Sequence, residues 1–274
     1  MRCSVKVLIA VFILSLLLTG CPVDEKFIFF PSAAIESTPK RFGVDYEDVY
    51  FTTRDGVKLN GWLALKPGAQ ATVLWFHGNA GNIGHRADSV KPLRDKLSVN
   101  VFIIDYRGYG RSEGVVSEQG TYEDAGAAFR YLTGRNDIDA KRIVIFGQSL
   151  GAAVAADLAG REECSAVILE APFASIPAMA KAIYPWLPIG PLIKTRYDVI
   201  EKVKKISAPL LIVHGDRDDI VPFEQGRRVF DAAAGPKEFH TLRGAHHNDT
   251  FETGGDAYFK VMRDFIEKAG NGSK

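Results

Sequence analysis

The sequence predicts an α/β fold with one domain, built on a mostly parallel sheet with helices on both faces. A chain of 274 residues, 46% hydrophobic, with 34 basic and 33 acidic side chains, can bury one large core. Short apolar runs rich in β-branched residues recur along it, and helical stretches lie between them. This alternation implies right-handed crossovers between parallel strands. A net charge of +1 is too weak to hold nucleic acid, so a nucleic-acid partner is excluded.

The first segment has the pattern of an export signal. Arg2 and Lys6 precede an apolar run, Val7–Leu18, that is shorter than the roughly 20 residues needed to span a bilayer. The run ends in Leu-Thr-Gly-Cys, which resembles the lipobox of bacterial lipoproteins. We therefore expect residues 1–20 to be removed and Cys21 to carry lipid, which would tether the protein to the bacterial cell envelope, facing outside the cytoplasm. The alternative is an ordinary secretory signal with an incidental cysteine.

Residues 21–40 are expected to form a lipid-anchored linker and residues 41–270 the folded domain. The domain opens with two strands near Val49–Thr53 and Val57–Ala64, which the turn signal Arg54-Asp55-Gly56 joins into an antiparallel hairpin. Six further strands are unbroken apolar runs, as strands buried on both faces should be: Ala71–Phe76, Val101–Asp105, Arg142–Phe146, Ala166–Leu169, Pro209–Val213 and Glu238–Leu242. The expected helices are Ile83–Leu97, Gln119–Leu132, Ser149–Ala159, Phe223–Ala233 and Asp256–Ala269.

One stretch, residues 173–200, interrupts the alternation of strands and helices. It contains four prolines among aromatic and aliphatic side chains, and it is too long for an ordinary connection in a compact domain. Its apolar residues would be badly placed in water, and long connections often carry function. We expect this cap segment to cover the site, although a plain surface excursion is the alternative.

A candidate nucleophile lies in Gly147-Gln148-Ser149-Leu150-Gly151. This motif follows the strand ending at Phe146 and opens an alanine-rich helix, which is the strand-turn-helix context of a nucleophile elbow. The turn strains the backbone of its central residue, and side chains at the flanking glycines would collide with neighbouring elements. The elbow therefore predicts that Ser149 stands at the carboxyl edge of the sheet, where the following helix N-terminus favours negative charge.

A serine hydroxyl needs a base to take its proton and a carboxylate to orient that base. The strand that begins at Pro209 runs into a loop with three acids, Asp216, Asp218 and Asp219, and Glu170 at the end of an earlier strand is a fallback acid. The residues alone leave the choice among these acids open.

The candidate bases are His246 and His247, after the last expected strand. Adjacent side chains on a loop point in different directions, so only one of the two is expected to serve the serine. A metal site is the competing interpretation. The sequence has neither a His-Glu-x-x-His helix nor a cysteine cluster, and neighbouring histidines seldom chelate one ion, so no metal is expected.

The loop His77–Asn82 follows an expected strand and is suited to bind an oxyanion. It would supply a main-chain N–H from Asn79, and Leu150, just after the nucleophile, would supply a second. A phosphate-binding loop is disfavoured because the Gly-Lys-Ser/Thr ending is missing. The glycines in residues 108–114 have the wrong spacing for a dinucleotide fingerprint.

Seven segments together resemble the Bem46-like branch of the α/β hydrolases: Phe29–Ser32, Asp55–Trp62, Phe76–Asn82, Asp105–Ser112, Gly147–Gly151, His214–Pro222 and His247–Asp249. The resemblance runs from about Phe27 to the C-terminal helix. It implies eight core strands, no cofactor, and esterase or thioesterase activity on acyl groups. It also implies Asp218 as the acid and His247 as the base, although His246 stands where the family usually has glycine.

The expected reaction is therefore hydrolysis of a carboxylic ester or thioester by Ser149, His247 and Asp218, with an acyl-containing or lipid-like substrate. A peptidase or amidase with the same triad is the first alternative. The second is a catalytically silent hydrolase-fold protein that acts as an interaction partner in the envelope. Cys3 leaves with the signal and Cys21 is lipidated, so Cys164 stands alone, and we expect it to be structural.

Overall fold

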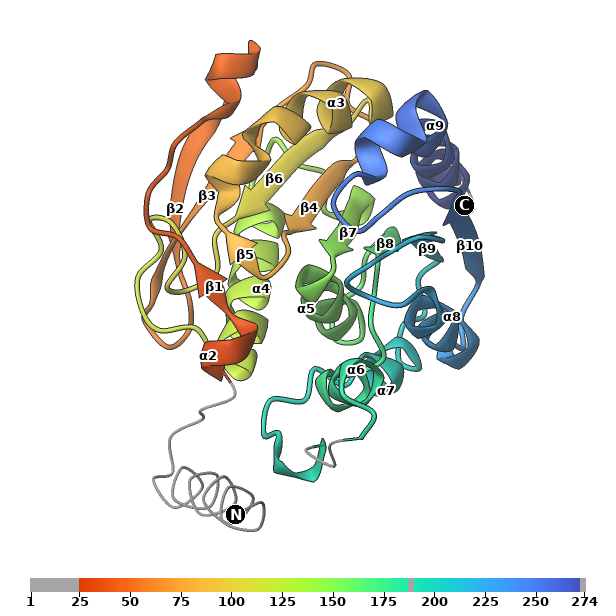
Figure 1. Ribbon diagram of the computed structural model, residues 1–274. Helices are drawn as coiled ribbons and strands as arrows, with labels where there is room; N and C mark the ends of the chain where they lie inside the picture. Colours follow the sequence, from red (N-terminus) through yellow and green to blue (C-terminus); the bar gives the residue numbers. More distant parts are fainter. Residues whose placement is uncertain (1–24, 187–189, 272–274) are drawn as a thin grey trace.

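The computed structural model describes residues 25–186 and 190–271 (Figure 1). The expected signal peptide, residues 1–20, and the expected lipidation site, Cys21, lie outside these ranges. Within them, none of the helices combines the length and the hydrophobicity that a membrane span requires.

The centre of the molecule is an eight-stranded sheet with the order β10-β9-β8-β7-β4-β6-β3-β2 (Figure 1). Its strands are β2 Glu47–Thr52, β3 Lys58–Ala64, β4 Thr72–Phe76, β6 Asn100–Ile104, β7 Ile143–Gln148, β8 Ala166–Glu170, β9 Leu210–Gly215 and β10 Lys237–Leu242. The pairs β2–β3 and β3–β6 are antiparallel, and all the other pairs of this sheet are parallel. The predicted fold class is confirmed, and the expected strands agree with the observed ones to within two residues at most ends.

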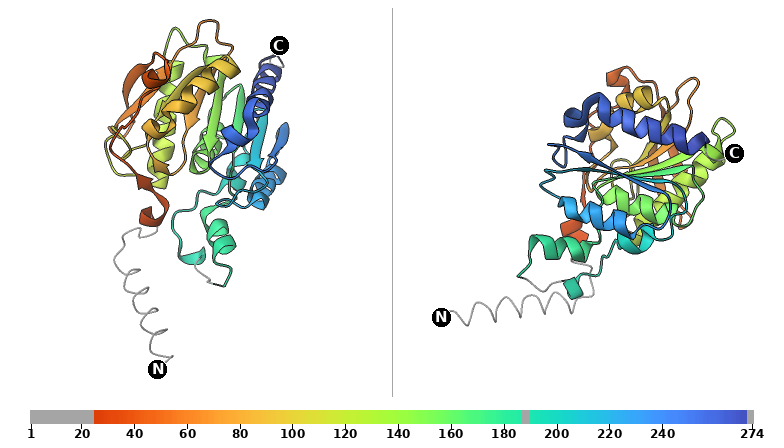
Figure 2. Two further views of the ribbon diagram at one scale, coloured as in Figure 1. Left: turned by 45° about the horizontal axis from the view of Figure 1, so that its top comes forward. Right: turned by 90° about the vertical axis from the view of Figure 1, so that its right-hand side faces the viewer.

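The central strands are apolar on both sides because helices cover both faces of the sheet. All five residues of β4 are buried, and they alternate between two cores. Trp75 packs into the core under α3 (Ala87–Leu97) and α9 (Thr250–Asn271). Phe76 packs into the opposite core, which also contains residues of α4 (Glu118–Thr133) and α5 (Leu150–Ala159). Two layers of helices therefore hold the sheet (Figures 1 and 2).

The remaining helices complete the two faces and the cap segment. They are α6 Ile176–Ile183, α7 Val199–Val203, α8 Phe223–Ala232 and the short 3₁₀ turns Pro39–Phe42, Ile83–Arg86, Ala140–Arg142 and Gly190–Leu192. The last helix starts earlier than expected, at Thr250, because a kink at Gly255 (φ 50°) joins two helical pieces. The sequence does not predict α6, because the prolines of the cap segment argue against a helix there, and α7, with five residues, is too short to show a helical period.

The described part of the expected linker, residues 25–40, packs against the folded domain. A short helix, α2 (Glu25–Ile28), leads into β1 (Phe30–Pro31), which pairs in parallel with β5 (Ala80–Gly81). Phe29 is buried and makes an edge-to-face contact with Tyr197. Phe29 thus buries surface that a solvated tether would leave exposed.

Candidate active site

Ser149 occupies a strained turn between β7 and α5. Its φ of 53° and ψ of −114° lie outside the regions that L-residues favour. A Cβ on Gly147 would lie 2.2 Å from the carbonyl oxygen of Gly151, and one on Gly151 would lie 2.0 Å from that of Phe76. The elbow glycines are therefore required by close packing between β7, α5 and β4, as the sequence predicts.

The elbow opens into a large cavity at the carboxyl edge of the parallel strands. This cavity has a volume of about 930 Å³, and Ser149 and His247 both line it. The main-chain N–H of Ser149 donates to the carbonyl of Glu170 at 2.9 Å. Its side chain caps no N–H of α5. The hydroxyl therefore keeps its lone pairs and its proton for chemistry in the cavity.

The imidazole of His247, which lines the same cavity as Ser149, is hydrogen-bonded to a carboxylate. Nδ1 of His247 lies 2.7 Å from Oδ2 of Asp218, and the two side chains are 8% and 1% exposed. The other oxygen, Oδ1, accepts from the main-chain N–H groups of Ile220 (2.9 Å) and Val221 (2.7 Å). A carboxylate fixed in this way holds Nδ1 protonated, which leaves Nε2 as the basic nitrogen.

Two opposing effects act on the pKa of Asp218. Burial alone would raise this pKa, but the hydrogen bonds from His214 and His247 favour the ionised form and lower it well below the ordinary value. The carboxylate therefore stays charged throughout the pH range in which an imidazole can act as a base.

The alternatives that the residues left open lie elsewhere. His246 is half exposed, and its Nδ1 is 3.6 Å from Oδ1 of the exposed Asp219. Asp216 accepts the main-chain N–H of Gly244 at 2.6 Å, which stabilises the neighbouring turn. The structure thus brings His247 and Asp218 together, and it leaves His246, Asp216 and Asp219 on the surface of the loops.

The hydrogen bond that proton transfer from Ser149 to His247 would use is not formed in this structure. Among the described residues the Ser149 hydroxyl makes no hydrogen bond with the imidazole, although both groups line one cavity. Catalytic hydrogen bonds are often long in unliganded sites and shorten when substrate binds.

Glu170, the fallback acid, belongs to a buried polar network beneath the elbow. Its Oε1 accepts from Nε2 of Gln148 (2.8 Å) and Oγ1 of Thr250 (3.0 Å), and its Oε2 accepts from the hydroxyl of Tyr258. Gln148 in turn accepts from the indole N–H of Trp75 at 2.9 Å. Burial raises the pKa of Glu170, although these three hydrogen bonds oppose the rise. The carboxyl group therefore ties the elbow to the start of α9, just after the His247 loop.

The two expected oxyanion donors, Asn79 and Leu150, both line the cavity. Leu150 is the first residue of α5, so its N–H has no partner within the helix. Neither main-chain N–H donates to another group in the part of the chain that the structure describes. Both donors remain available to an anion in the cavity, which is consistent with their expected role.

The loop that carries Asn79 is fastened to the N-terminal segment. The side-chain amide of Asn79 donates to the carbonyl of Ile28 (2.8 Å). The main-chain carbonyl of Asn79 accepts from the N–H of Phe30 (3.1 Å) and from the hydroxyl of Tyr109 (2.7 Å). The buried Asn82 donates to the carbonyls of Ser32 (2.9 Å) and Ala34 (2.7 Å). The sequence does not predict this clamp because the partners in the N-terminal segment lie about 50 positions away.

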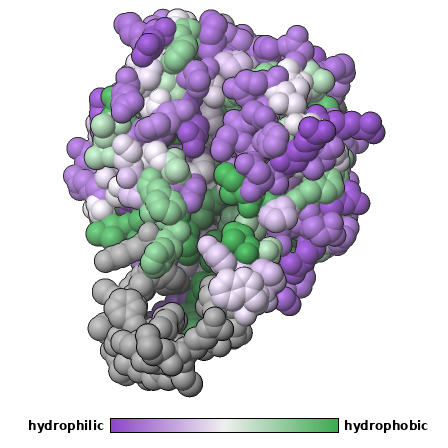
Figure 3. Space-filling view, viewed as in Figure 1, coloured by the Kyte–Doolittle hydropathy of each residue, from purple (hydrophilic) through white to green (hydrophobic). Residues whose placement is uncertain are grey.

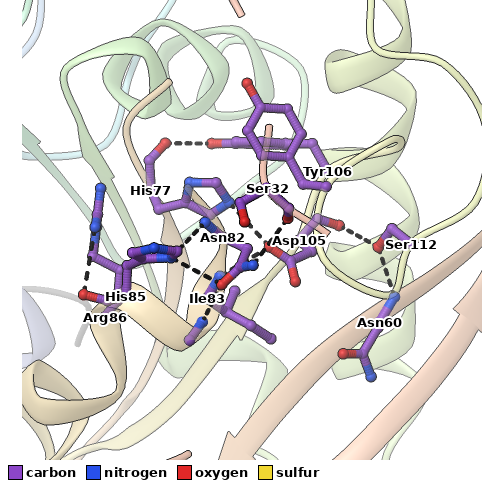
Figure 4. A network of polar contacts seen from close by, with 12 residues as sticks. Ser32, Asn60, His77, Asn82, Ile83, His85, Arg86, Asp105, Tyr106 and Ser112 are labelled. Atoms are coloured by element: carbon purple, nitrogen blue, oxygen red, sulfur yellow. Dashed lines mark hydrogen bonds and ion pairs between the residues drawn. The ribbon is translucent and has the colours of Figure 1, made fainter. Parts of the chain in front are cut away.

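Behind the loop, a second buried network supports the start of the oxyanion region (Figure 4). Asp105 accepts the N–H of Ile83 at 2.9 Å, and its Oδ1 lies 3.5 Å from Nε2 of His77. The hydroxyl of Tyr106 donates to the carbonyl of His77 at 2.9 Å. Both His77 and Asp105 are fully buried, so this network fixes the loop from the side that faces away from the cavity.

The cap segment forms one wall of the cavity. Phe173, Ile176, Met179, Ile183 and Ile193 line it, and all five are apolar. The elbow and the His247 loop add polar groups to the lining, among them Gln148, Ser149 and Asn248. In the described ranges, no group of three or more His, Cys, Asp or Glu side chains is arranged as metal ligands would be.

Comparison with known proteins identifies the class to which this chain belongs. A family profile described as "Serine aminopeptidase, S33" matches residues 67–193 and 189–254. The chain is 39% identical over 262 residues to Protein bem46 of Schizosaccharomyces pombe, covering 88% of this chain and 85% of that protein. It is 36% identical over 270 residues to the α/β hydrolase domain-containing protein WAV2 of Arabidopsis thaliana, covering 89% and 88%.

The chain therefore belongs to the Bem46-like branch of the α/β hydrolases. An uncharacterised protein of Mycobacterium tuberculosis is also 38% identical over 245 residues, covering 89% of this chain and 87% of that protein. Among solved structures, an esterase of Pyrococcus furiosus aligns with a TM-score of 0.75 and 24% identity over 88% of this chain and 98% of that one. At that level of identity, the structural likeness supports the fold alone.

Proposed function

We propose that this hydrolase cleaves carboxylic esters or thioesters of acyl groups through Ser149, His247 and Asp218. The observation that carries the proposal is the 2.7 Å hydrogen bond between His247 and Asp218, in the same cavity as the strained elbow serine. A binding protein has no need of a buried carboxylate that orients an imidazole in the cavity of an elbow serine, so this geometry argues against a silent interaction partner.

In the proposed reaction, Nε2 of His247 removes the hydroxyl proton as Oγ of Ser149 attacks the acyl carbonyl carbon. The resulting oxyanion would accept hydrogen bonds from the N–H groups of Asn79 and Leu150, each worth about 3 kcal/mol of transition-state stabilisation. The imidazolium then gives its proton to the leaving alcohol or thiol as the bond to the acyl carbon breaks. Water, activated by the same imidazole, releases the acid from Ser149.

The cavity favours an acyl substrate over a purely polar one. The wall from the cap segment is apolar, and the volume of about 930 Å³ is enough for an extended acyl chain.

We also propose that Cys21 carries the lipid that holds the enzyme at the membrane, as the lipobox pattern indicates.

Labelling with a fluorophosphonate tests the nucleophile. We expect one covalent adduct at Ser149 and no turnover of p-nitrophenyl esters by Ser149→Ala. A matched control is Ser89→Ala, because Ser89 lines the same cavity but its hydroxyl donates a hydrogen bond to the Asp88 carboxylate at 3.1 Å. That variant should still be labelled. Folded wild-type protein that takes up no label would favour a silent protein instead.

A peptidase or amidase is the second candidate, and the description of the matching family profile favours it. The same triad can attack an amide if the leaving amine is protonated by His247. Comparing kcat/KM for acyl esters of varied chain length with that for aminoacyl amides separates the two. A preference for the amides would replace the ester proposal.

A further inference from the structure

Several of the residues that line the cavity are apolar and exposed, and they stand among exposed polar ones such as Asp88 and Glu252. Phe27 of α2, Ile183 and Tyr184 at the end of α6, and Ile220 after β9 line the cavity and are also exposed to solvent. Trp186, 75% exposed, makes an edge-to-face contact with Tyr184. These five residues, the apolar rim, come from three segments that are distant in the sequence. Exposed apolar side chains gathered around one cavity differ from singly scattered surface hydrophobics and indicate an interaction site.

The apolar rim lies where the described chain begins. Figures 1 and 2 show α2 and α6 at the same end of the molecule, and Figure 3 shows apolar residues gathered there while the opposite end is mostly polar. Cys21 precedes Glu25 by four residues, which can span at most about 14 Å. A lipid on Cys21 would therefore hold the membrane close to this face.

The charges of the cap segment also suit a membrane surface. Residues 173–200 contain three basic residues, Lys181, Lys194 and Arg196, and one acidic residue, Asp198, which lies 3.8 Å from Arg196. Cations near an anionic leaflet contribute about 1 kcal/mol each at the surface. Trp and Tyr, both present in the rim, are the residues that prefer the boundary between headgroups and acyl chains.

We propose that the apolar rim docks on the lipid bilayer, so that the acyl chain of the substrate enters the cavity directly from the membrane. This inference rests on the proposed acyl hydrolase function and names its substrate class, which is an acyl ester or thioester embedded in a bilayer. The long chain passes from lipid to the apolar wall of the cavity and never crosses water, whereas the polar side of the cavity receives the carbonyl group.

Tryptophan fluorescence gives a direct test, because Trp186 is exposed while Trp62 and Trp75 are buried. The full-length protein is mixed with vesicles of phosphatidylethanolamine and phosphatidylglycerol whose acyl chains are brominated near the headgroup. We expect the Trp186 emission to shift to the blue and to be quenched, and Trp186→Phe to lose this response. Protein that stays in solution, or that floats with the vesicles unquenched, overturns the docking. A blue-shifted emission without vesicles, together with a concentration-dependent mass, would assign the rim to a second copy of the chain.

Turnover provides a second test with a matched control. Trp186→Ser combined with Leu192→Ser removes the rim tryptophan and a second exposed apolar side chain of the cap segment, and neither of them lines the cavity. Val115→Ser removes an apolar side chain, 83% exposed, that belongs to neither the cap segment nor the cavity. We expect hydrolysis of a long-chain acyl thioester in vesicles to fall about tenfold in the double variant only, because two apolar anchors leave the membrane. Hydrolysis of a soluble acetyl ester should be unchanged. Equal loss on both substrates, or no loss, overturns the proposal.

The two tests separate a failure of docking from a failure of the proposed function. Quenching requires no turnover, and the soluble ester requires no membrane. Wild-type protein that docks but hydrolyses neither substrate would leave the rim as a membrane surface and remove the acyl hydrolase function on which the substrate class depends.

Discussion

The residues beneath Ser149 and those above it are held in place by different means. Beneath it, the Glu170 carboxyl group is fully buried and accepts hydrogen bonds from Gln148, Thr250 and Tyr258. Above it, no residue of α6 is buried, and Ile183 is half exposed at the rim. Satisfied buried networks are rigid, whereas segments with little burial open at low free-energy cost. The chemical groups are thus fixed, and the wall that contacts the acyl chain is free to adjust.

The largest effect that tests this contrast should come from Asp218→Asn. The amide removes the charge that stabilises the imidazolium and allows the wrong tautomer of His247, so kcat should fall by about 10⁴-fold with KM little changed. Steady-state kinetics on a soluble ester measures both. Asp219→Asn is the matched control, because that carboxylate is exposed beside His246. A larger loss in Asp219→Asn would show that the acid has been assigned wrongly.

The next effect concerns the Glu170 network. Glu170→Ala leaves three buried donors without their acceptor, which should lower the free energy of unfolding by about 3 kcal/mol. Glu170→Gln keeps an acceptor for Gln148 and Thr250, and its NH₂ group can donate to Tyr258, so it should lose less. Chemical denaturation of the three proteins measures the difference. Equal stability of the alanine variant and the wild type would mean that the network does not hold the elbow.

The wild type and Glu170→Gln also give a test of how stability changes with pH, and the direction of the change can be predicted. Because burial raises the pKa of Glu170 in the folded state, its contribution to stability is complete below the unfolded pKa of about 4.3 and is lost as pH rises through the folded pKa. Glu170→Gln cannot titrate, so the stability of the wild type relative to this variant should be greatest at acid pH. Thermal unfolding from pH about 4 to about 9 measures this difference. A difference that grows with pH would contradict the raised pKa.

A smaller effect is expected from the adjustable wall. Met179→Trp places a bulkier side chain in the cavity. As a result, kcat/KM for the longest accepted acyl ester should fall about tenfold, while kcat/KM for the acetyl ester should change little. A panel of p-nitrophenyl esters measures the chain-length profile. Ala182→Trp is the control, since Ala182 lies on the exposed part of the same helix. A uniform loss over all chain lengths in Met179→Trp would show that α6 supports the chemistry itself.

The smallest effect should come from Cys164, away from both regions. Burial raises the pKa of its thiol to about 12, so it carries little thiolate at neutral pH. Iodoacetamide should leave esterase activity intact, and Cys164→Ala should cost about 1 kcal/mol of stability or less. Rapid inactivation by the reagent, prevented in the alanine variant, would give this cysteine a functional role.

The sequence determined the sheet, the elbow and the order of the candidate site residues. Strands buried on both faces must be continuous apolar runs, and a serine at φ 53° requires small neighbours, so both features can be recognised locally. The sequence did not determine that residues 25–40 pack on the domain, because β1 has only two residues and its partner β5 lies about 50 positions away.

The family resemblance implied His247 and Asp218, but only the tertiary structure shows their hydrogen bond, and only it shows that Glu170 joins the elbow to Thr250 and Tyr258. Both results depend on the directions of side chains on loops and on contacts between residues 29 to 88 positions apart. The periodicity of a sequence reports which residues of a segment are buried together. It carries no information on which distant segment faces them, because that choice is made by the packing of the whole domain.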